Sequence, residues 1–185
     1  MSRVYSIISS LALMILVLDQ WTKKTVLDLF QFEGESKPFL SWWQWTFVHN
    51  RGLAFGVFNG PNSPFPPDLQ KVLLSILPFL ILGGLWYFHI RKFEKNEIYR
   101  PLTMGLVVGG ALGNFIDRIH LSYVVDFIDW FYTTKSGSCI PLFYTVDGNT
   151  CHWPVFNVAD EAVTIALILI MFESYVLNKN APTSR

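Results

Sequence analysis

The sequence predicts a membrane protein, an all-α bundle of four transmembrane helices with a small extracytoplasmic β subdomain. Apolar residues make up 51% of the 185 positions, whereas Asp, Glu, Lys and Arg together make up only 15%. A soluble domain usually carries about 25% charged residues, so this chain has too few charges to cover a globular surface. Its length fits a single integral membrane domain over residues 1–185.

Four apolar segments define the predicted helices, at residues 4–18, 72–90, 102–116 and 155–177. A helix needs roughly 20 mostly apolar residues to cross the bilayer core, so the second and fourth segments are long enough. The first and third segments reach that length only by including polar residues at one end, beginning with Asp19 and Asn114. Polar side chains at such helix ends point to a functional site.

The basic residues set the predicted orientation. The short loop at 91–100 holds four of them, and others lie near both termini, on the same side of a four-helix arrangement. Basic residues in short loops stay in the cytoplasm, so we expect both termini there. The long segments at about 20–71 and 119–154 are then expected on the outer side of the membrane.

The first long outer segment has a composition typical of β structure. Residues 37–58 are rich in Trp, Phe, Thr and Val, which favour strands, whereas glycine and prolines at 60–67 interrupt any regular element. We therefore expect an extracytoplasmic β-rich segment within 28–67, followed later in the chain by a second extracytoplasmic loop at 119–154.

The two cysteines, Cys139 and Cys151, both lie in the second outer loop. A disulfide is allowed outside the cytoplasm, but their spacing leaves a bond and two free thiols equally open. A metal site is disfavoured because only His152 lies nearby, and zinc needs more ligands than these residues supply.

Acidic and amide side chains gather at the outer ends of three predicted helices. Such side chains are costly in a membrane and by default mark a function. They are Asp19 after the first segment, Asn114, Asp117 and Arg118 at the end of the third, and Asn157, Asp160 and Glu161 at the start of the fourth. One common polar site near the outer leaflet is the simplest account of all of them.

Several of these residues also have a structural interpretation. Asp117 beside Arg118 fits an ion pair that holds a helix end, and we favour this over a chemical role. Asp19 fits either a contact with a ligand or a helix cap paired with a neighbouring lysine. Asn157 fits either a helix N-cap or a contact with substrate.

Gly105, Gly109 and Gly113 follow one another at intervals of four residues. Small residues at this spacing let another helix approach closely. We therefore expect the third helix to pack in the interior of the bundle, with its polar end beside the first and fourth helices.

Two carboxylates at this membrane face predict shared-proton chemistry. Asp126 lies in the apolar run 124–130, so we expect a desolvated carboxyl, and Asp160 or Glu161 supplies a second acid. Like charges held close cannot both ionise, so one acid keeps a proton while the other takes one from water. This is the chemistry of an aspartic peptidase, although a proton-coupled transporter uses similar acids.

Five short motifs combine these residues. They are DQWTK at 19–23, NRGLAFG at 50–56, GALGNFIDR at 110–118, VVDF at 124–127 and FNVAD at 156–160. In this order, and over nearly the whole chain, they strongly resemble the lipoprotein signal peptidases of bacteria, also called signal peptidase II. Each motif alone is weak, but the combination is highly specific.

The resemblance implies an intramembrane aspartyl endopeptidase of the bacterial inner membrane. It would remove the signal peptide from a diacylglyceryl-modified prolipoprotein, cutting just before the lipidated cysteine. Asp126 and Asp160 match the catalytic pair of the family. The positions that match its substrate-binding residues are Asn157, Asn114, Arg118, Asn50, Gly52, Asp19 and Lys23, with Asp117 supporting Arg118.

The resemblance also implies the partners of the protein. They would be the prolipoprotein substrate and membrane lipid, for a monomer that needs no cofactor or metal and is inhibited by cyclic peptides of the globomycin type. The outer β segment would form a cradle on the membrane surface. Nucleic acid is not expected, because 14 basic residues are balanced by 14 acidic ones.

The chain departs from the family pattern between the two acids. Asp126 and Asp160 are 34 positions apart, a longer separation than the family usually has, and the excess lies at 133–153. Our hypothesis is that Cys139 and Cys151 close this insert as a small disulfide lobe.

Two rival functions stay open at this stage. A small proton-coupled membrane transporter would use Asp117, Asp126 and Asp160 as a proton relay and would cleave no peptide. A non-enzymatic scaffold that binds a lipidated tail would tolerate Asp→Asn changes. The position of the acids at one membrane face, away from the midplane, counts against the transporter.

Overall fold

The computed structural model describes residues 2–52, 98–135, 137–145 and 149–180, together with separate positions between 66 and 87. Of the predicted second helix at 72–90, only such separate positions are described, and each is helical. Most of the predicted cytoplasmic loop at 91–100 and most of the Gly/Pro segment lie outside the described residues.

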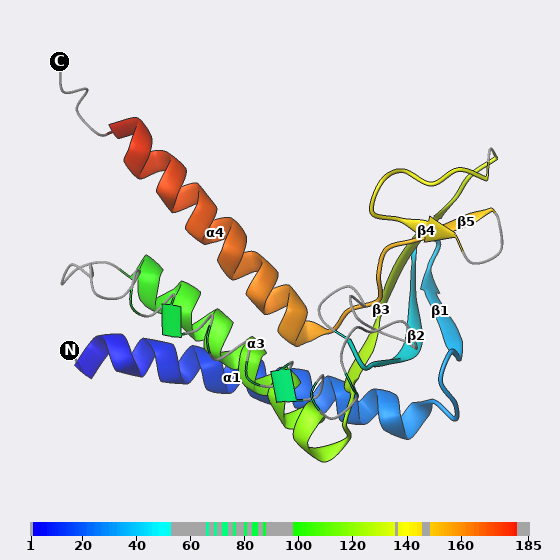
Figure 1. Cartoon of the computed structure of the whole chain (residues 1–185), viewed down its shortest axis with the longest axis horizontal. Helices are drawn as coiled ribbons and strands as arrows, with labels where there is room; N and C mark the ends of the chain where they lie inside the picture. The colour runs from blue at the N-terminus through cyan, green and yellow to red at the C-terminus, as the bar shows by residue number, and fades with distance from the viewer. Residues whose placement is uncertain are drawn as a thin grey trace.

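Three of the four predicted helices lie wholly within the described residues. They are α1 (Ser2–Leu29), α3 (Tyr99–His120) and α4 (Val158–Asn180). The helix α3 packs against both α1 and α4, and the sheet lies beyond one end of these helices (Figure 1). Among the described residues, Arg3–Leu29 is long and apolar enough, by length and composition, to cross a membrane.

The first helix is longer than its apolar segment predicts. With 28 residues, α1 reaches about 42 Å at 1.5 Å per residue, whereas a bilayer core is about 30 Å thick. Asp19 therefore lies within the helix and does not cap its end. The helix continues past the apolar segment because Gln20 and Lys23 are bonded to Asp117 of α3. The expected pairing of Asp19 with a neighbouring lysine is confirmed, with Lys23 as the partner.

The predicted close approach at the glycine row is confirmed. A Cβ at Gly105 would lie 2.9 Å from the Cβ of Leu11, and one at Gly109 would lie 2.8 Å from the carbonyl oxygen of Ala12. These two glycines therefore face α1. A Cβ at Gly113 would collide with the carboxylate of Asp19, so the third glycine makes room for a functional side chain.

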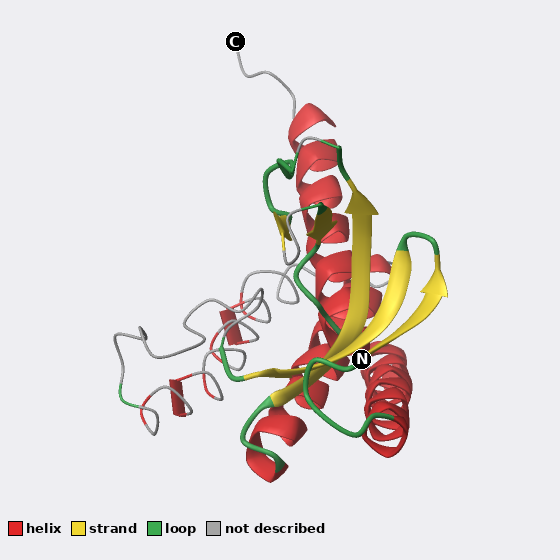
Figure 2. Ribbon diagram, turned by 90° about the vertical axis from the view of Figure 1, so that its right-hand side faces the viewer, coloured by secondary structure: helices red, strands yellow, loops and turns green. Residues whose placement is uncertain are grey.

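Five antiparallel strands form one sheet in the order β1-β2-β3-β5-β4 (Figure 2). They are β1 (Ser36–Leu40), β2 (Trp43–Asn50), β3 (Val124–Thr133), β4 (Tyr144–Thr145) and β5 (Thr150–His152). The first two confirm the predicted β-rich segment. The other three lie in the second outer loop, where the sequence analysis expected no strands.

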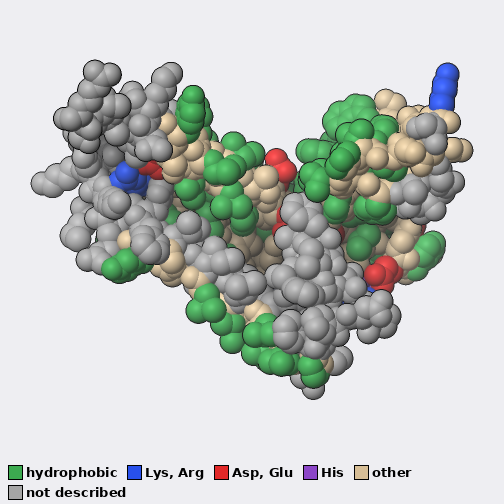
Figure 3. Space-filling view, turned by 45° about the horizontal axis from the view of Figure 1, so that its top comes forward, with side chains coloured by type: hydrophobic (Ala, Val, Ile, Leu, Met, Phe, Trp, Pro, Cys, Tyr) green, Lys and Arg blue, Asp and Glu red, His purple; other side chains and the backbone are tan. Residues whose placement is uncertain are grey.

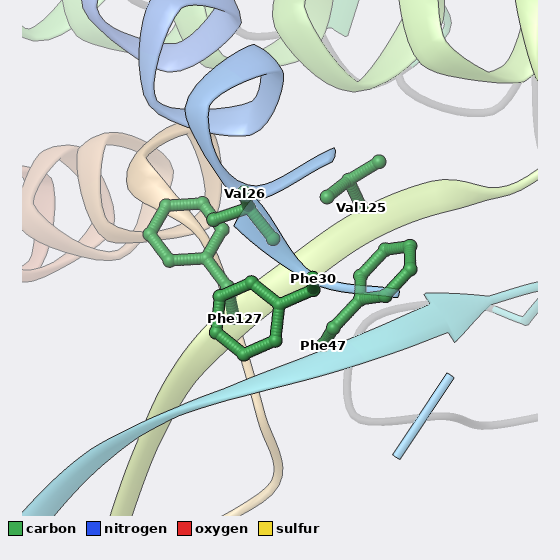
Figure 4. Packing of buried hydrophobic residues seen from close by; sticks show 5 residues of the cluster. All are labelled: Val26, Phe30, Phe47, Val125 and Phe127. Atoms are coloured by element: carbon green, nitrogen blue, oxygen red, sulfur yellow. The ribbon is translucent and has the colours of Figure 1, made fainter. Parts of the chain in front are cut away.

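A small hydrophobic core fixes the sheet to the outer end of α1 (Figure 4). Val26 and Phe30, from the last turns of α1 and the residue after it, pack against Phe47 of β2 and against Val125 and Phe127 of β3. Burying a large apolar side chain stabilises a fold by about 1.5–3 kcal/mol. The C-terminal turns of α1 thus hold the two strands that flank the polar site.

The two cysteines are joined by a disulfide, Cys139–Cys151. Cys151 is fully buried on β5, and its strand pairs with β3 at Tyr132. The hypothesis of a small disulfide lobe is therefore confirmed. This lobe, residues 134–152, leaves the sheet at the end of β3 and returns to it through β5.

We predict that Gly109→Val loosens the packing of α1 on α3. The added Cβ would lie 2.8 Å from both the Ala12 carbonyl oxygen and the Ile15 Cβ, neither of which can move cheaply. Overpacking of this kind costs about 1–3 kcal/mol, so the midpoint of thermal unfolding in detergent should fall. Gly83→Ala is the control, since no described atom lies within 4 Å of that Cβ position. Equal midpoints for the two variants would contradict this packing.

Candidate active site

Asp126 and Asp160 are brought to one place by different elements. Asp126 lies on β3 and is 1% exposed, whereas Asp160 lies in the first turn of α4 and is half-buried. The side chain of Asn157 links them, because its Nδ2 donates to Asp126 Oδ1 at 2.6 Å while its Oδ1 accepts from the backbone N–H of Asp160 at 3.0 Å.

Asn157 is also the N-cap of α4, as one of the two predicted interpretations has it. Its own backbone N–H donates to Asp160 Oδ2 at 3.2 Å, so the cap and the third helical residue bond reciprocally. Reciprocal capping of this kind satisfies two backbone N–H groups at a helix start. The Asp160 carboxylate is thereby fixed at the positive end of the helix dipole.

Asp126 has a second amide partner on the neighbouring strand. Asn50 Nδ2 donates to Asp126 Oδ2 at 2.9 Å, and the backbone N–H of Gly52 donates to Asn50 Oδ1 at 2.9 Å. Arg118 Nη2 in turn donates to the Gly52 carbonyl oxygen at 3.0 Å. The end of β2 and the side chain of Arg118 therefore hold Asn50 in place against the acid.

Asp160 has a second amide partner on α3. Asn114 Nδ2 donates to Asp160 Oδ1 at 2.8 Å. The Oδ1 atom of Asn114 accepts from Asn157 Nδ2 at 3.1 Å and from the ammonium of Lys23 at 2.9 Å. Asn114 thus connects Asp160 to a buried cation.

Lys23 is 2% exposed and lies between two carboxylates. Its Nζ is 2.8 Å from Asp19 Oδ2 and 3.0 Å from Asp117 Oδ2. With Asn114, these acceptors use all three hydrogens of the ammonium. Asp19 Oδ1 also accepts the backbone N–H of Ala159 at 3.0 Å, so Asp19 joins α1 to the start of α4.

The predicted ion pair of Asp117 with Arg118 is wrong, because the two side chains bind different partners. Asp117 binds Lys23, Gln20 Nε2 at 3.0 Å and the backbone N–H of Val125 at 3.0 Å, whereas Arg118 reaches Gly52. Consecutive residues of a helix point about 100° apart, so the two side chains face different neighbours. Asp117 therefore supports Lys23 and the start of β3, next to Asp126.

Gln20 was missed as a site residue. Its Nε2 donates to Asp117 Oδ1 at 3.0 Å and to the Gly113 carbonyl oxygen at 3.2 Å. A signal existed, because Gln20 adjoins Asp19 within the first motif. All ten site residues named in the sequence analysis, together with Gln20, lie in one hydrogen-bonded network.

The electrostatics of this network favour one shared proton. Burial and, next to it, the negative charge of Asp160 raise the pKa of Asp126 well above its ordinary value of 3.8. Asn114, which donates to Asp160 Oδ1, also accepts from the Lys23 ammonium, so a buried cation is linked to Asp160 through one amide. The arrangement therefore suits a protonated Asp126 beside an ionised Asp160.

The surface is hollowed between the helices and the sheet. Figure 3 shows this hollow between the helices and the sheet, with acidic side chains at its centre and hydrophobic side chains on both flanks. Asp160 is the more exposed of the two acids. A ligand in the hollow would meet the dyad from one side, with apolar surface around it.

A separate polar cluster surrounds Asp129 on β3. Asp129 is 2% exposed and accepts from Gln44 Nε2 and Thr46 Oγ1, both at 2.7 Å. The Nδ1 atom of His152 lies 2.8 Å from its other oxygen. This carboxylate ties β3 to β2 and β5. Within the described part of the chain, no group of three His, Cys, Asp or Glu side chains is arranged to hold a metal.

Comparison with known proteins identifies the family. The sequence profile of the family described as signal peptidase (SPase) II matches residues 11–176. The chain belongs to the signal peptidase II family. The transporter interpretation has no support from this finding.

Relatives and solved structures agree with this family. A protein of Acinetobacter baumannii named lipoprotein signal peptidase is 33% identical over 93% of this chain and 85% of its own length. A protein of Geobacillus thermodenitrificans with the same name is 33% identical over 89% of this chain and 87% of its own length. Two solved bacterial membrane enzymes are similar in fold. The first has a TM-score of 0.70 and 27% identity, over 96% of this chain and 93% of its own. The second has a TM-score of 0.65 and 29% identity, over 90% of this chain and 90% of its own. As a member of this family, the chain is an aspartic-type peptidase of a bacterial membrane.

We predict that Lys23→Met destabilises the protein far more than Lys24→Met. Removing the Lys23 ammonium leaves Asp19 and Asp117 buried without their cation, which costs about 3–5 kcal/mol. Lys24 pairs with Asp28 in the next helical turn, but their side chains are 74% and 61% exposed, so its loss costs about 1 kcal/mol at most. Unfolding midpoints of the two variants in one detergent measure the difference, and similar midpoints would contradict a central role for Lys23.

A second prediction concerns pH. Because the pKa of Asp126 is raised in the fold, its contribution to stability is complete below 3.8 and declines as pH rises through the raised value. The stability of the wild type should therefore fall more with rising pH than that of Asp126→Asn, whose side chain does not titrate. Unfolding midpoints across the acidic and neutral range measure both slopes. Parallel slopes would show that Asp126 has the same pKa folded and unfolded.

Proposed function

We propose that this protein removes signal peptides from prolipoproteins with Asp126 and Asp160 as its two catalytic acids. Signal peptide removal is the activity of the family to which the chain belongs, and its relatives bear the name lipoprotein signal peptidase. The observation that carries the choice of acids is Asn157, which binds both of them. Without such a link, two acids from separate elements would not keep one geometry.

In this mechanism the dyad starts with one proton, held by Asp126. The ionised Asp160 accepts a proton from a water molecule as its oxygen attacks the carbonyl carbon of the scissile peptide bond. Asp126 donates its proton to the carbonyl oxygen, so no full negative charge develops there. Collapse of the tetrahedral intermediate then breaks the C–N bond. Asp160 donates its proton to the leaving nitrogen, and Asp126 takes one back from a hydroxyl of the intermediate, which restores the starting dyad.

The amide side chains keep the two acids in place during these transfers. Asn50 and Asn157 each donate to one oxygen of Asp126, and Asn114 donates to Asp160. Amides do not titrate, so the donor pattern stays the same in both protonation states of the dyad. Lys23 stabilises the one negative charge that the dyad keeps.

The proposed substrate is a prolipoprotein whose cysteine carries diacylglycerol, cut just before that cysteine. Supporting this is the apolar outer face of α4, on which Ile168 is 55% exposed and Met171 and Phe172 are both 64% exposed. Such a face fits lipid chains in the bilayer. Acyl chains of the substrate would stay in the outer leaflet while the peptide bond reaches the hollow.

We further propose that both termini lie in the cytoplasm and that the sheet lies on the outer surface of the membrane. There it would form a cradle for the substrate, and the protein would act as a monomer. The density of basic residues near the termini and in the 91–100 loop supports this orientation. The position of the sheet beyond one end of the helices is consistent with it (Figure 1).

The decisive variants are Asp126→Asn and Asp160→Asn. Each removes a titratable group from the dyad but keeps its shape, so we expect kcat for a lipidated precursor to fall about 10³-fold or more. The measurement is release of signal peptide from a purified lipidated precursor, followed by gel shift or mass spectrometry.

Asp129→Asn is the matched control. Asp129 is equally buried on the same strand, but it binds Gln44, Thr46 and His152 and not the dyad. We expect this variant to cleave at a rate within about tenfold of the wild type, although its unfolding midpoint falls. Normal turnover by Asp126→Asn, or an equal loss with Asp129→Asn, would contradict the assignment.

A further inference from the structure

The disulfide lobe carries an exposed apolar turn that the proposed chemistry does not use. Ile140 is 59% exposed, Leu142 is 75% exposed and Tyr144 is 46% exposed. No charged residue occurs between Lys135 and Asp147. Exposed aliphatic side chains in an uncharged segment are costly in water and mark a contact surface.

The backbone holds this apolar turn in an unfavourable conformation. Leu142 has a φ of 77°, in the left-handed region that branched, bulky side chains rarely adopt. The turn is closed by a hydrogen bond from the backbone N–H of Phe143 to the Ile140 carbonyl oxygen, at 3.1 Å. A glycine or asparagine would adopt this conformation more easily, so the leucine is retained there at a cost.

The turn is also fixed by a disulfide, a hydrogen bond and an aromatic contact to β3 and β5. Cys139, immediately before it, is bonded to Cys151 of β5, and the backbone N–H of Ile140 donates to the Tyr132 hydroxyl at 2.9 Å. The Phe143 ring packs against Tyr132, with centroids 5.2 Å apart. The lobe thus presents Ile140 and Leu142 on a prebuilt support, as a docking element requires.

The lobe lies where it can reach the membrane surface beside the hollow. In Figure 1 the chain between β3 and β4 curls back toward the side of the sheet on which α4 lies. In Figure 3 hydrophobic side chains gather on the flank of the hollow formed by the sheet, opposite the flank formed by the helices. The exposed apolar face of α4, which includes Met171 and Phe172, is the other surface that we expect to contact lipid.

We propose that the Cys139–Cys151 lobe is a membrane-docking element that inserts Ile140 and Leu142 between phospholipids of the outer leaflet. Lipid is the occupant that fits a charge-free aliphatic turn on a membrane protein, with Tyr144 at the depth where amphipathic rings reside. The proposal rests on the orientation proposed above but not on the roles of Asp126 and Asp160.

Docking of the lobe would affect the position of Asp126 and Asn157, because the lobe is continuous in the chain with both. The lobe connects β3, which carries Asp126, to the segment that ends at Asn157 and α4. That returning segment is bonded to β3, by the Trp153 N–H to the Trp130 carbonyl oxygen at 2.8 Å and by the bridge between Ile128 and Phe156. A docked lobe would hold the sheet, and with it the hollow, at a fixed height over the lipid.

Site-directed photo-cross-linking tests the occupant. The full chain carries p-benzoylphenylalanine in place of Ile140, in nanodiscs of phosphatidylethanolamine and phosphatidylglycerol. The control carries it in place of Asn149, which is exposed in the same lobe but outside the apolar turn. Burying one aliphatic side chain changes a partition constant by about tenfold or more, so we expect about tenfold more phospholipid adduct at position 140 than at 149.

Mass spectrometry of the adducts separates the outcomes. Adducts with phospholipid support the proposal. Equal lipid adduct at both positions, adducts with a second copy of the chain, or adducts formed only with added precursor would overturn it. Cleavage of the precursor in the same nanodiscs tests the proposed function separately, because cross-linking to lipid does not require catalysis.

A double variant, Ile140→Asn with Leu142→Asn, separates docking from folding. Asparagine tolerates the backbone conformation at 142, so a purely structural role predicts unchanged or slower hydrogen exchange in the lobe. Loss of docking predicts exchange about tenfold faster at residues 137–145 in nanodiscs, with exchange in β2 unchanged. Unchanged exchange in the lobe would contradict docking.

Discussion

The buried ammonium of Lys23 is the interaction on which the rest of the site depends. A cation with almost no exposure is tolerated only when its hydrogens are all bonded and its charge is balanced. Lys23 meets both conditions with Asp19, Asp117 and Asn114. Each partner then acts elsewhere, since Asp117 binds the start of β3 beside Asp126, Asn114 binds Asp160, and Asp19 binds the start of α4.

This dependence explains which parts of the structure the sequence could predict. The glycine row, the capping role of Asn157 and the two acids were visible because each depends on local spacing or on a motif. The length of α1 was not, because hydrophobicity falls at Asp19 and the helix continues only through tertiary contacts with α3. The role of Lys23 could not be predicted for the same reason. Except for Asp19, its partners lie 91 or more positions away in the sequence.

The sheet shows a related limit. Residues 124–133 carry the β-branched and aromatic residues of a strand, yet their pairing with β2 joins segments far apart in the chain. Only that pairing puts Asn50 beside Asp126. The partners of Asp117 could not be predicted either, because the contact of its carboxylate with Val125 N–H depends on how tightly the chain turns between α3 and β3. Sequence spacing favoured Arg118, which the helix directs elsewhere.

The sheet also connects the chemistry to the membrane. Two of its strands, β2 and β3, are fixed to α1 by the core that includes Phe47 and Phe127, whereas β4 and β5 belong to the disulfide lobe. The two acids are thus held between the helices and the sheet. The geometry of the dyad is set by contacts on both sides, and no single element carries it alone.

We infer that the pair of Asp126 and Asp160 keeps one proton and that Asp126 holds it, because the pKa of Asp126 is raised by burial and by the charge of Asp160. Infrared difference spectroscopy of the wild type against Asp126→Asn and Asp160→Asn, with aspartate labelled by carbon-13, measures this directly. The account predicts a protonated carboxyl C=O band at neutral pH in the wild type that Asp126→Asn abolishes. A wild type without that band, or one whose band is lost only in Asp160→Asn, would contradict it.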